Sequence, residues 1–122
     1  TPQSENRLGG PRVQGRGEQK DAVIEDAVAV QEAGASAVVL EMVPADVAKK
    51  VTRILRIPTI GIGAGAATDG QVLVWTDMAG MTDWSPRFSK RFGDVGGALA
   101  LAAAGFRDAV KGRGFPTEEN SF

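Results

Sequence analysis

The chain has 122 residues, with 14 Lys and Arg against 15 Asp and Glu, and a formal net charge of -1. Its length fits one domain, its near-neutral charge argues against a nucleic-acid binder, and its apolar runs are far shorter than the roughly 18 residues of a membrane span. Cysteine and histidine are absent, so any chemistry uses carboxylates, lysines, hydroxyls, backbone amides or oxygen-ligated metals.

The first part of the chain predicts a loop followed by alternating helices and strands. Residues 1–17 combine glycines, prolines and arginines without an apolar period, which indicates a surface loop. Apolar residues recur at helical spacing over 18–33, and again in a helix expected to begin at Pro44 and to end before Pro58. Between them, the wholly apolar run at 37–40 is typical of a strand buried on both faces of a parallel sheet.

Two further apolar runs complete a small parallel sheet. Residues 57–62 predict the second strand and residues 72–75 the third. Because strands alternate with helices, we expect the three strands to pair in parallel in chain order, with the helices packed on one side. The connection between the last two strands leaves room for one helical turn at most, since parallel crossovers need about 10–12 residues.

A long amphipathic helix is expected towards the end of the chain. Ser85 is a favourable N-cap and Pro86 suits the first helical position, so the ten residues that precede this start, 76–85, are expected to form a loop. Apolar residues then recur at spacings of three and four over 88–110, and the Gly96-Gly97 pair is expected to divide the helix. The tail from 112 to 122 is expected to be irregular.

Glu41 is the most informative candidate for chemistry. It directly follows the apolar run at 37–40, and parallel α/β proteins gather functional groups at the carboxyl ends of their strands. A carboxylate at that place can act as a general base, although a glutamate at the end of a strand can also be a solvent-exposed side chain without a catalytic role.

The glycine loop after the second strand is the second candidate. Gly61, Gly63 and Gly65 would let backbone amides approach an anion or cofactor closely, and we take them as the cofactor-binding residues. A dinucleotide fingerprint is disfavoured, because residues 67–70 do not resemble the long helix that it requires. A tight turn that lines a pocket is the favoured interpretation.

Three loop carboxylates are candidates for a metal site. Asp69, Asp77 and Asp83 carry oxygen ligands of the kind that Mg²⁺ prefers. Their spacing resembles no known loop cage, so they are expected to face solvent in turns. The chain itself is therefore expected to contribute no metal ligand.

Several segments together resemble the ketopantoate hydroxymethyltransferase family. They are GGPRVQGRG at 9–17, VLEMVP at 39–44, PTIGIGAGAATDGQVLVWTDMAG at 58–80, RFSKRFGDVG at 87–96 and FPTEENSF at 115–122. The resemblance implies a (β/α)8 TIM barrel, in which residues 1–122 would form a single partial domain holding the last three strand–helix units, the terminal helix and the tail. Because such barrels usually need about 250 residues, and the chain starts at Thr1 rather than at a methionine, we expect a fragment.

The resemblance also implies a reaction. Members of this family transfer a hydroxymethyl group from 5,10-methylenetetrahydrofolate to 3-methyl-2-oxobutanoate, which gives ketopantoate (2-dehydropantoate) for pantothenate biosynthesis. The glutamate of the VLExVP motif, here Glu41, would be the general base. Mg²⁺ would chelate the 2-oxo acid through ligands in the missing amino-terminal half, so the fragment alone is expected to be inactive. A cytoplasmic homo-oligomer, a decamer in the family, is implied, with the oxo acid and folate as partners and neither nucleic acid nor membrane.

Departures from the family pattern and two alternatives stay open. Pro11 stands where an aromatic residue is usual, Phe92 where tyrosine is common, and Asn120 where a terminal histidine is typical. One alternative is a non-catalytic anion- or nucleotide-binding module that uses the glycine loop. The other is a related 2-oxo acid carbon–carbon lyase, whose usual reactive cysteine motif is missing here.

Overall fold

The computed structural model describes residues 13, 15, 17 and 19–122, so the loop expected over 1–17, Pro11 included, lies largely outside the described residues. The chain divides into two compact units, residues 1–72 and residues 73–122. The first unit is α/β and carries a three-stranded parallel sheet in the order β1-β2-β3. Its elements are α2 (Gln19–Glu32), β1 (Val38–Glu41), α3 (Ala45–Ile54), β2 (Thr59–Ile62) and β3 (Gly70–Gln71). The α/β class and the parallel order predicted from the sequence are confirmed.

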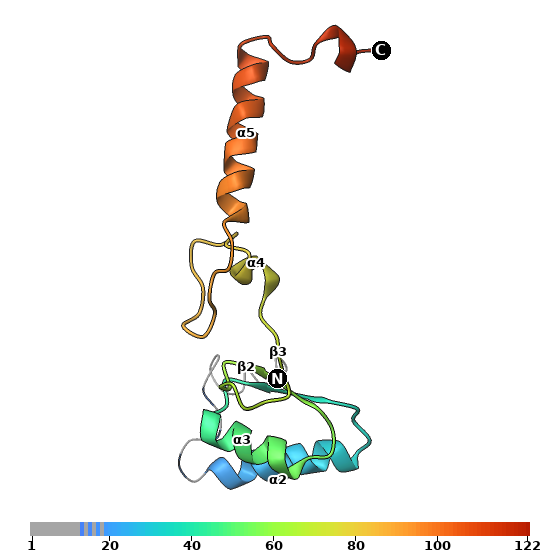
Figure 1. The fold of residues 1–122 in the computed structure, drawn as a ribbon, viewed down its shortest axis with the longest axis vertical. Helices are drawn as coiled ribbons and strands as arrows, with labels where there is room; N and C mark the ends of the chain where they lie inside the picture. Colours follow the sequence, from blue (N-terminus) through green and yellow to red (C-terminus); the bar gives the residue numbers. More distant parts are fainter. Residues whose placement is uncertain (1–12, 14, 16, 18) are drawn as a thin grey trace. The chain divides into compact units, whose positions relative to one another are not determined.

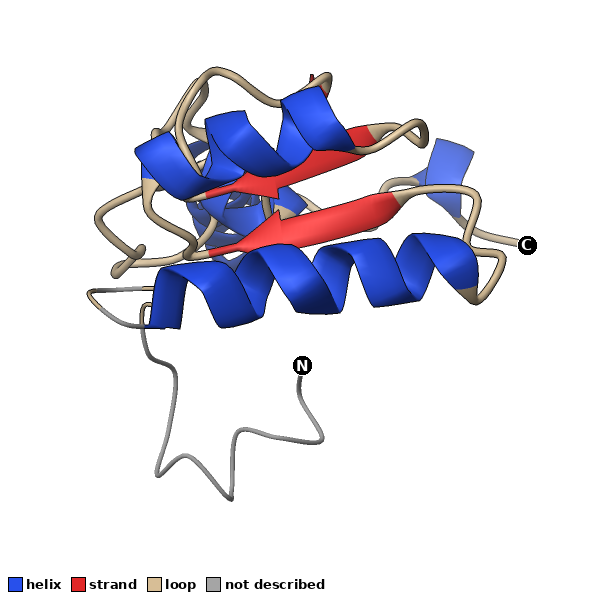
Figure 2. Cartoon of the chain, turned by 90° about the horizontal axis from the view of Figure 1, so that it is seen from below, coloured by secondary structure: helices blue, strands red, loops and turns tan. Residues whose placement is uncertain are grey.

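Helices α2 and α3 lie on the same side of this sheet (Figure 1), and the view from that side shows them running alongside the strands (Figure 2). Leu40 of β1 is only 5% exposed beneath them, whereas its neighbour Val39 is 55% exposed. Side chains alternate between the two faces of a strand, so these residues mark a covered face and an open face. The prediction that the run at 37–40 is buried on both faces is wrong for the described residues, because the helices cover one side alone. The core under the helices consists of Ala27, Leu40, Val43, Val47, Ala48, Val51 and Ala64.

Helix α3 follows the sequence closely because local signals set both of its ends. Pro44 is the N-cap, so the helix begins at Ala45, one residue later than expected. Leu55 is already extended, ahead of Pro58. Val47 and Val51 lie one turn apart on the face that packs against the sheet, and both are fully buried. Each buried valine contributes roughly 1.5–3 kcal/mol to folding.

The third strand does not lie where the sequence predicted it. Strand β3 occupies Gly70–Gln71 rather than 72–75, and Trp75 instead begins a helix. Gly70 pairs with Ile60 because the preceding residue, Asp69, is hydrogen-bonded to the start of β2. The register of this short strand is therefore set by a polar contact, and the apolar residues that follow it gave a misleading signal.

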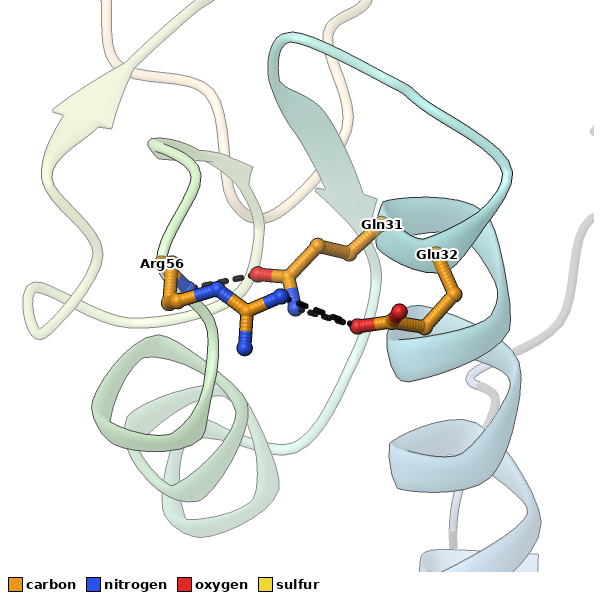
Figure 3. Close-up of polar contacts among 3 residues, drawn as sticks. All are labelled: Gln31, Glu32 and Arg56. Atoms are coloured by element: carbon orange, nitrogen blue, oxygen red, sulfur yellow. Dashed lines mark hydrogen bonds and ion pairs between the residues drawn. The ribbon is translucent and has the colours of Figure 1, made fainter.

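The amino edge of the sheet is held by contacts between α2 and the loop that precedes β2 (Figure 3). The Gln31 side-chain carbonyl accepts a hydrogen bond from the backbone N–H of Arg56 at 2.6 Å. The Arg56 guanidinium also pairs with Glu32 at 3.0 Å, with both side chains exposed. Exposed ion pairs contribute only about 0–1 kcal/mol, so the backbone hydrogen bond is the more specific link.

The second unit contains α4 (Trp75–Met78), α5 (Val95–Lys111) and a short 3-10 helix, η1 (Glu118–Asn120). The loop expected over 76–85 therefore includes most of α4, and the tail, expected to be irregular, includes η1. The long helix begins nine residues later than Pro86 suggested. These boundaries correct the sequence-based prediction.

The late start of α5 has a physical cause in the residues around position 95. The Asp94 side chain caps the helix by accepting a hydrogen bond from the N–H of Gly97 at 3.2 Å. A Cβ at Gly96 would lie 2.7 Å from the carbonyl oxygen of Gly80, so only glycine allows this close backbone contact. The glycine pair therefore lies in the first turn of α5 and does not divide the helix.

Candidate active site

Glu41 is the last residue of β1, at the carboxyl edge of the sheet. It pairs in register with Ile62 of β2, and it is exposed. Because it follows the buried Leu40, it belongs to the open face of the strand, together with Val39. The strand thus presents a carboxylate at its end, on the face that the helices do not cover.

The residue after Glu41 ends the strand sharply. Met42 has a φ of 52°, a left-handed conformation that costs a non-glycine residue on the order of 1–2 kcal/mol. Its N–H donates to the carbonyl oxygen of Ile62 at 2.9 Å, and the next residue, Val43, is buried in the core. The backbone that carries Glu41 is therefore fixed on both sides, by the sheet and by the turn into α3.

The glycine loop leaves β2 at the same edge of the sheet. Gly63 and Gly65 have φ values of 64° and 81°, which glycine adopts without steric cost. A Cβ at Gly65 would lie 2.5 Å from the Cβ of Ala45, the first residue of α3. Between these glycines, Ala64 is fully buried in the core that also holds Val43. The structure therefore brings the glycine loop against the turn that follows Glu41.

Gly61 has a different requirement from the other two glycines. It is buried within β2, and a Cβ there would lie 2.7 Å from the Thr68 hydroxyl and 3.1 Å from the side-chain nitrogen of Gln71. A larger residue at this position would therefore displace the Thr68 and Gln71 side chains. The binding of an anion or cofactor by Gly61, Gly63 and Gly65 stays a prediction.

Sequence reasoning did not identify the two polar side chains that fix this loop. The Gln71 side-chain amide donates to the carbonyl oxygen of Gly65 at 2.9 Å and to the Thr68 hydroxyl at 2.8 Å. The Thr68 hydroxyl in turn donates to the carbonyl oxygen of Gly70 at 2.9 Å. The polar turn at 68–71 was the available signal, since such turns hydrogen-bond their own backbone.

The three candidate metal carboxylates are used in other ways or stand apart. Asp69 lies at the amino edge of β2, opposite to Glu41, and its carboxylate accepts hydrogen bonds from the Thr59 N–H at 2.8 Å and the Thr59 hydroxyl at 3.0 Å. These donors, the amide first, lower the pKa of Asp69. In the second unit, Asp77 accepts from Thr82 at 3.0 Å, and Asp83 is exposed. Among the described residues, no three acidic side chains gather where a metal ion could bind.

The helices that the structure describes are all too short or too polar to span a membrane.

The chain is similar to proteins of known name along its whole length. Residues 1–118 match the family model for ketopantoate hydroxymethyltransferase. Over 123 aligned residues, the chain is 63% identical to the 3-methyl-2-oxobutanoate hydroxymethyltransferase of Saccharopolyspora erythraea, and 58% and 59% identical to those of Rhodococcus jostii and Leifsonia xyli. These alignments cover 100% of this chain but 42%, 43% and 44% of the respective relatives. The chain therefore spans less than half the length of the curated relatives that it matches.

Proposed function

This chain belongs to the ketopantoate hydroxymethyltransferase family, and we propose that it forms part of an enzyme that converts 3-methyl-2-oxobutanoate to ketopantoate. The relatives' names state the group transferred and its acceptor. In the proposal, 5,10-methylenetetrahydrofolate donates the one-carbon unit. A cytoplasmic homo-oligomer, a decamer by family resemblance, belongs to the same proposal.

The architecture supports a (β/α)8 barrel, of which this chain would provide the last three strand–helix units. The strands are parallel in chain order, and α2 and α3 cover one face alone. In such a barrel the helices form the outer ring, and the opposite face of the strands lines the interior. The exposed Val39 lies on that opposite face, as an interior position would.

The observation that carries the mechanism is the position of Glu41. In barrel enzymes of this kind, catalytic groups lie at the carboxyl ends of the strands. Glu41 lies at that end of β1 and on the open face, beside the glycine loop. We assign it the role of general base, which removes a proton from C3 of 3-methyl-2-oxobutanoate. The carbon then forms the new bond to the one-carbon unit, while both bonds of that unit to the folate nitrogens break and water supplies the hydroxyl oxygen. The two folate nitrogens take up the proton held on the Glu41 carboxyl and the remaining proton of the water, so that tetrahydrofolate leaves.

The described residues do not fit the magnesium ion that the family resemblance implies. The Asp69 carboxylate is occupied by Thr59 at the opposite edge of the sheet, and no acidic cluster of three exists among the described residues. Ligands for Mg²⁺ would come from outside the described residues. The proton transfer assigned to Glu41 is therefore derived without the metal.

The proposal is tested in a chimera of the Saccharopolyspora erythraea relative in which this chain replaces the matching 123 residues. The chimera should exchange the C3 proton of 3-methyl-2-oxobutanoate for deuterium in D2O, which NMR follows directly. Glu41→Gln should slow this exchange about 10²- to 10⁴-fold, the usual cost of losing a positioned base, while calorimetry shows unchanged binding of the oxo acid. Glu25→Gln, which changes an exposed glutamate of α2, is the matched control and should exchange normally.

Two outcomes would contradict this assignment. Normal exchange in the Glu41→Gln chimera would place the base elsewhere. Absence of exchange in the unmodified chimera, combined with binding of phosphate or nucleotide at the glycine loop, would favour the anion-binding module instead.

A further inference from the structure

The connection between β2 and β3 contains no helix, and two side chains occupy the space that a crossover helix would cover. Gly61 pairs with Leu40 on one side and with Gln71 on the other, so the three residues share the helix-covered face of the sheet. A Cβ at Gly61 would meet the Thr68 hydroxyl and the Gln71 amide at 2.7 Å and 3.1 Å. These polar groups therefore lie directly over the backbone of β2.

The hydrogen bonds of this pair fix the orientation of the Gln71 amide. Its nitrogen has two N–H donors, and both have acceptors, the Gly65 carbonyl at 2.9 Å and the Thr68 hydroxyl at 2.8 Å. The Thr68 hydroxyl in turn donates a hydrogen bond to the Gly70 carbonyl oxygen at 2.9 Å. The flipped amide would direct an oxygen at the Gly65 carbonyl, so the network selects one arrangement.

The same loop supports the turn at 42–44 that follows Glu41, which we call the Glu41 turn. Gly65 lies against Ala45 so closely that an added Cβ would be 2.5 Å from the Ala45 Cβ. The core holds Ala64 from the glycine loop and Val43 from the Glu41 turn. A displacement of the glycine loop is therefore transmitted to the Glu41 turn through packed backbone.

We propose that Gln71 is a positioning residue: its side-chain amide, with Thr68, holds the Gly63–Gly65 loop in the place that sets the Glu41 carboxylate. The proposal rests on the role assigned to Glu41 as the base. Gln71 itself acts on the loop and not on the substrate. Its loss is expected to lower the rate of proton removal while leaving the binding of the oxo acid unchanged.

The test uses the same chimera and the deuterium-exchange assay. Gln71→Met keeps the length of the side chain but removes both donors, and kcat for C3 exchange should fall about tenfold to a hundredfold, because small misplacements of a catalytic group have effects of this size. The KM for the oxo acid should change by less than about twofold, because the lost interaction is not a substrate contact. Thr68→Ser keeps the hydroxyl and should retain the rate, whereas the isosteric Thr68→Val should lose rate as Gln71→Met does.

Gln31→Met is the matched control, because it removes a glutamine hydrogen bond to the Arg56 backbone at the opposite edge of the sheet (Figure 3). It should lower the thermal midpoint without changing kcat. Equal kcat values for Gln71→Met and the parent chimera would overturn the positioning role. A kcat of Gln31→Met that falls together with its thermal midpoint would overturn it as well. Either result leaves the Glu41 assignment intact if Glu41→Gln is inactive, whereas normal exchange in Glu41→Gln removes both proposals.

Discussion

At the scale of single residues, the carboxylate of Asp69 satisfies two donors of the buried Thr59. The Thr59 side chain is fully buried, and its hydroxyl also contacts the Thr52 hydroxyl at 2.8 Å. Buried polar groups left without partners cost about 1–3 kcal/mol each, so the carboxylate has a structural role at this position. Asp69 thereby connects the start of β2 to the start of β3.

This contact predicts a specific dependence of stability on pH. The Thr59 amide and hydroxyl hold the pKa of Asp69 below its usual value of 3.8. A carboxyl whose pKa is lower in the folded state contributes stability that is complete above the unfolded pKa and is lost as the pH falls through the folded pKa. We therefore expect the midpoint temperature of thermal unfolding to decrease once the pH is lowered beyond about 4.

Asp69→Asn should remove part of the decrease in thermal midpoint at acid pH, and it should lower the midpoint at pH 7. Thermal melts followed by circular dichroism at pH 7, 5, 4 and 3 measure both effects. Asp26→Asn, at an exposed position of α2, should leave the profile unchanged. Some acid sensitivity persists in Asp69→Asn, since the Lys20 ammonium at 2.7 Å lowers the pKa of Asp46. An unchanged profile in Asp69→Asn would show that the Thr59 contact does not affect stability.

The candidate site shows which residues a sequence can identify. The place of Glu41 at the end of β1 could be predicted because it directly follows an apolar run, whereas its role as the base stays a prediction. Gln71 could not be predicted as part of the site, because its place opposite Gly61 depends on the register between β2 and β3. Asp69 is exposed in a turn as expected, but its contact with Thr59 could not be predicted, since the two residues are ten positions apart in sequence.

At the scale of elements, the helices and strands divide into those with local signals and those set by distant contacts. Helix α3 has an apolar face and Pro58 beyond its end, and β1 has a continuous apolar run, so both were predicted nearly to the residue. The start of α5 was not, because Asp94 and Ser85 are both plausible N-caps and the close contact of Gly96 with Gly80 favours Asp94. Sequence periodicity contains no information on such contacts.

Gly65→Ala is expected to destabilise the first unit by more than its backbone conformation alone explains. The positive φ costs alanine on the order of 1 kcal/mol, and the 2.5 Å approach of the new Cβ to Ala45 adds about 1–3 kcal/mol of overpacking. Gly34→Ala isolates the first contribution, because Gly34 also has a positive φ, 92°, but open space around its Cα. Urea denaturation of both variants measures the difference. Equal losses in the two would mean that Ala45 yields to the added methyl group.

At the scale of the whole molecule, the described chain leaves apolar surface uncovered in each of its units. Val39 is exposed on the open face of β1, and in α5 the side chains of Val95, Leu99, Leu101, Phe106 and Val110 are all exposed. Monomeric proteins rarely expose contiguous apolar surface of this kind, and unpaired sheet edges favour association. The relatives are more than twice as long as this chain, which fits a structure that needs further elements to cover its interior.

The isolated chain is therefore expected not to catalyse the transfer. Removal of a proton from C3 requires groups that stabilise the charge developing on the neighbouring keto oxygen, and such electrostatic stabilisation is often the largest part of catalysis. Among residues 19–122, no acidic cluster that could bind a metal accompanies Glu41. The open face of β1 also leaves the Glu41 carboxylate in water, where fixed charges act weakly. The purified chain, incubated with 3-methyl-2-oxobutanoate, Mg²⁺ and methylenetetrahydrofolate, should yield no ketopantoate, whereas the chimera should. Turnover by the chain within about tenfold of the chimera, a difference of only about 1.4 kcal/mol in the barrier, would show that these residues complete the site without the rest of the family's length.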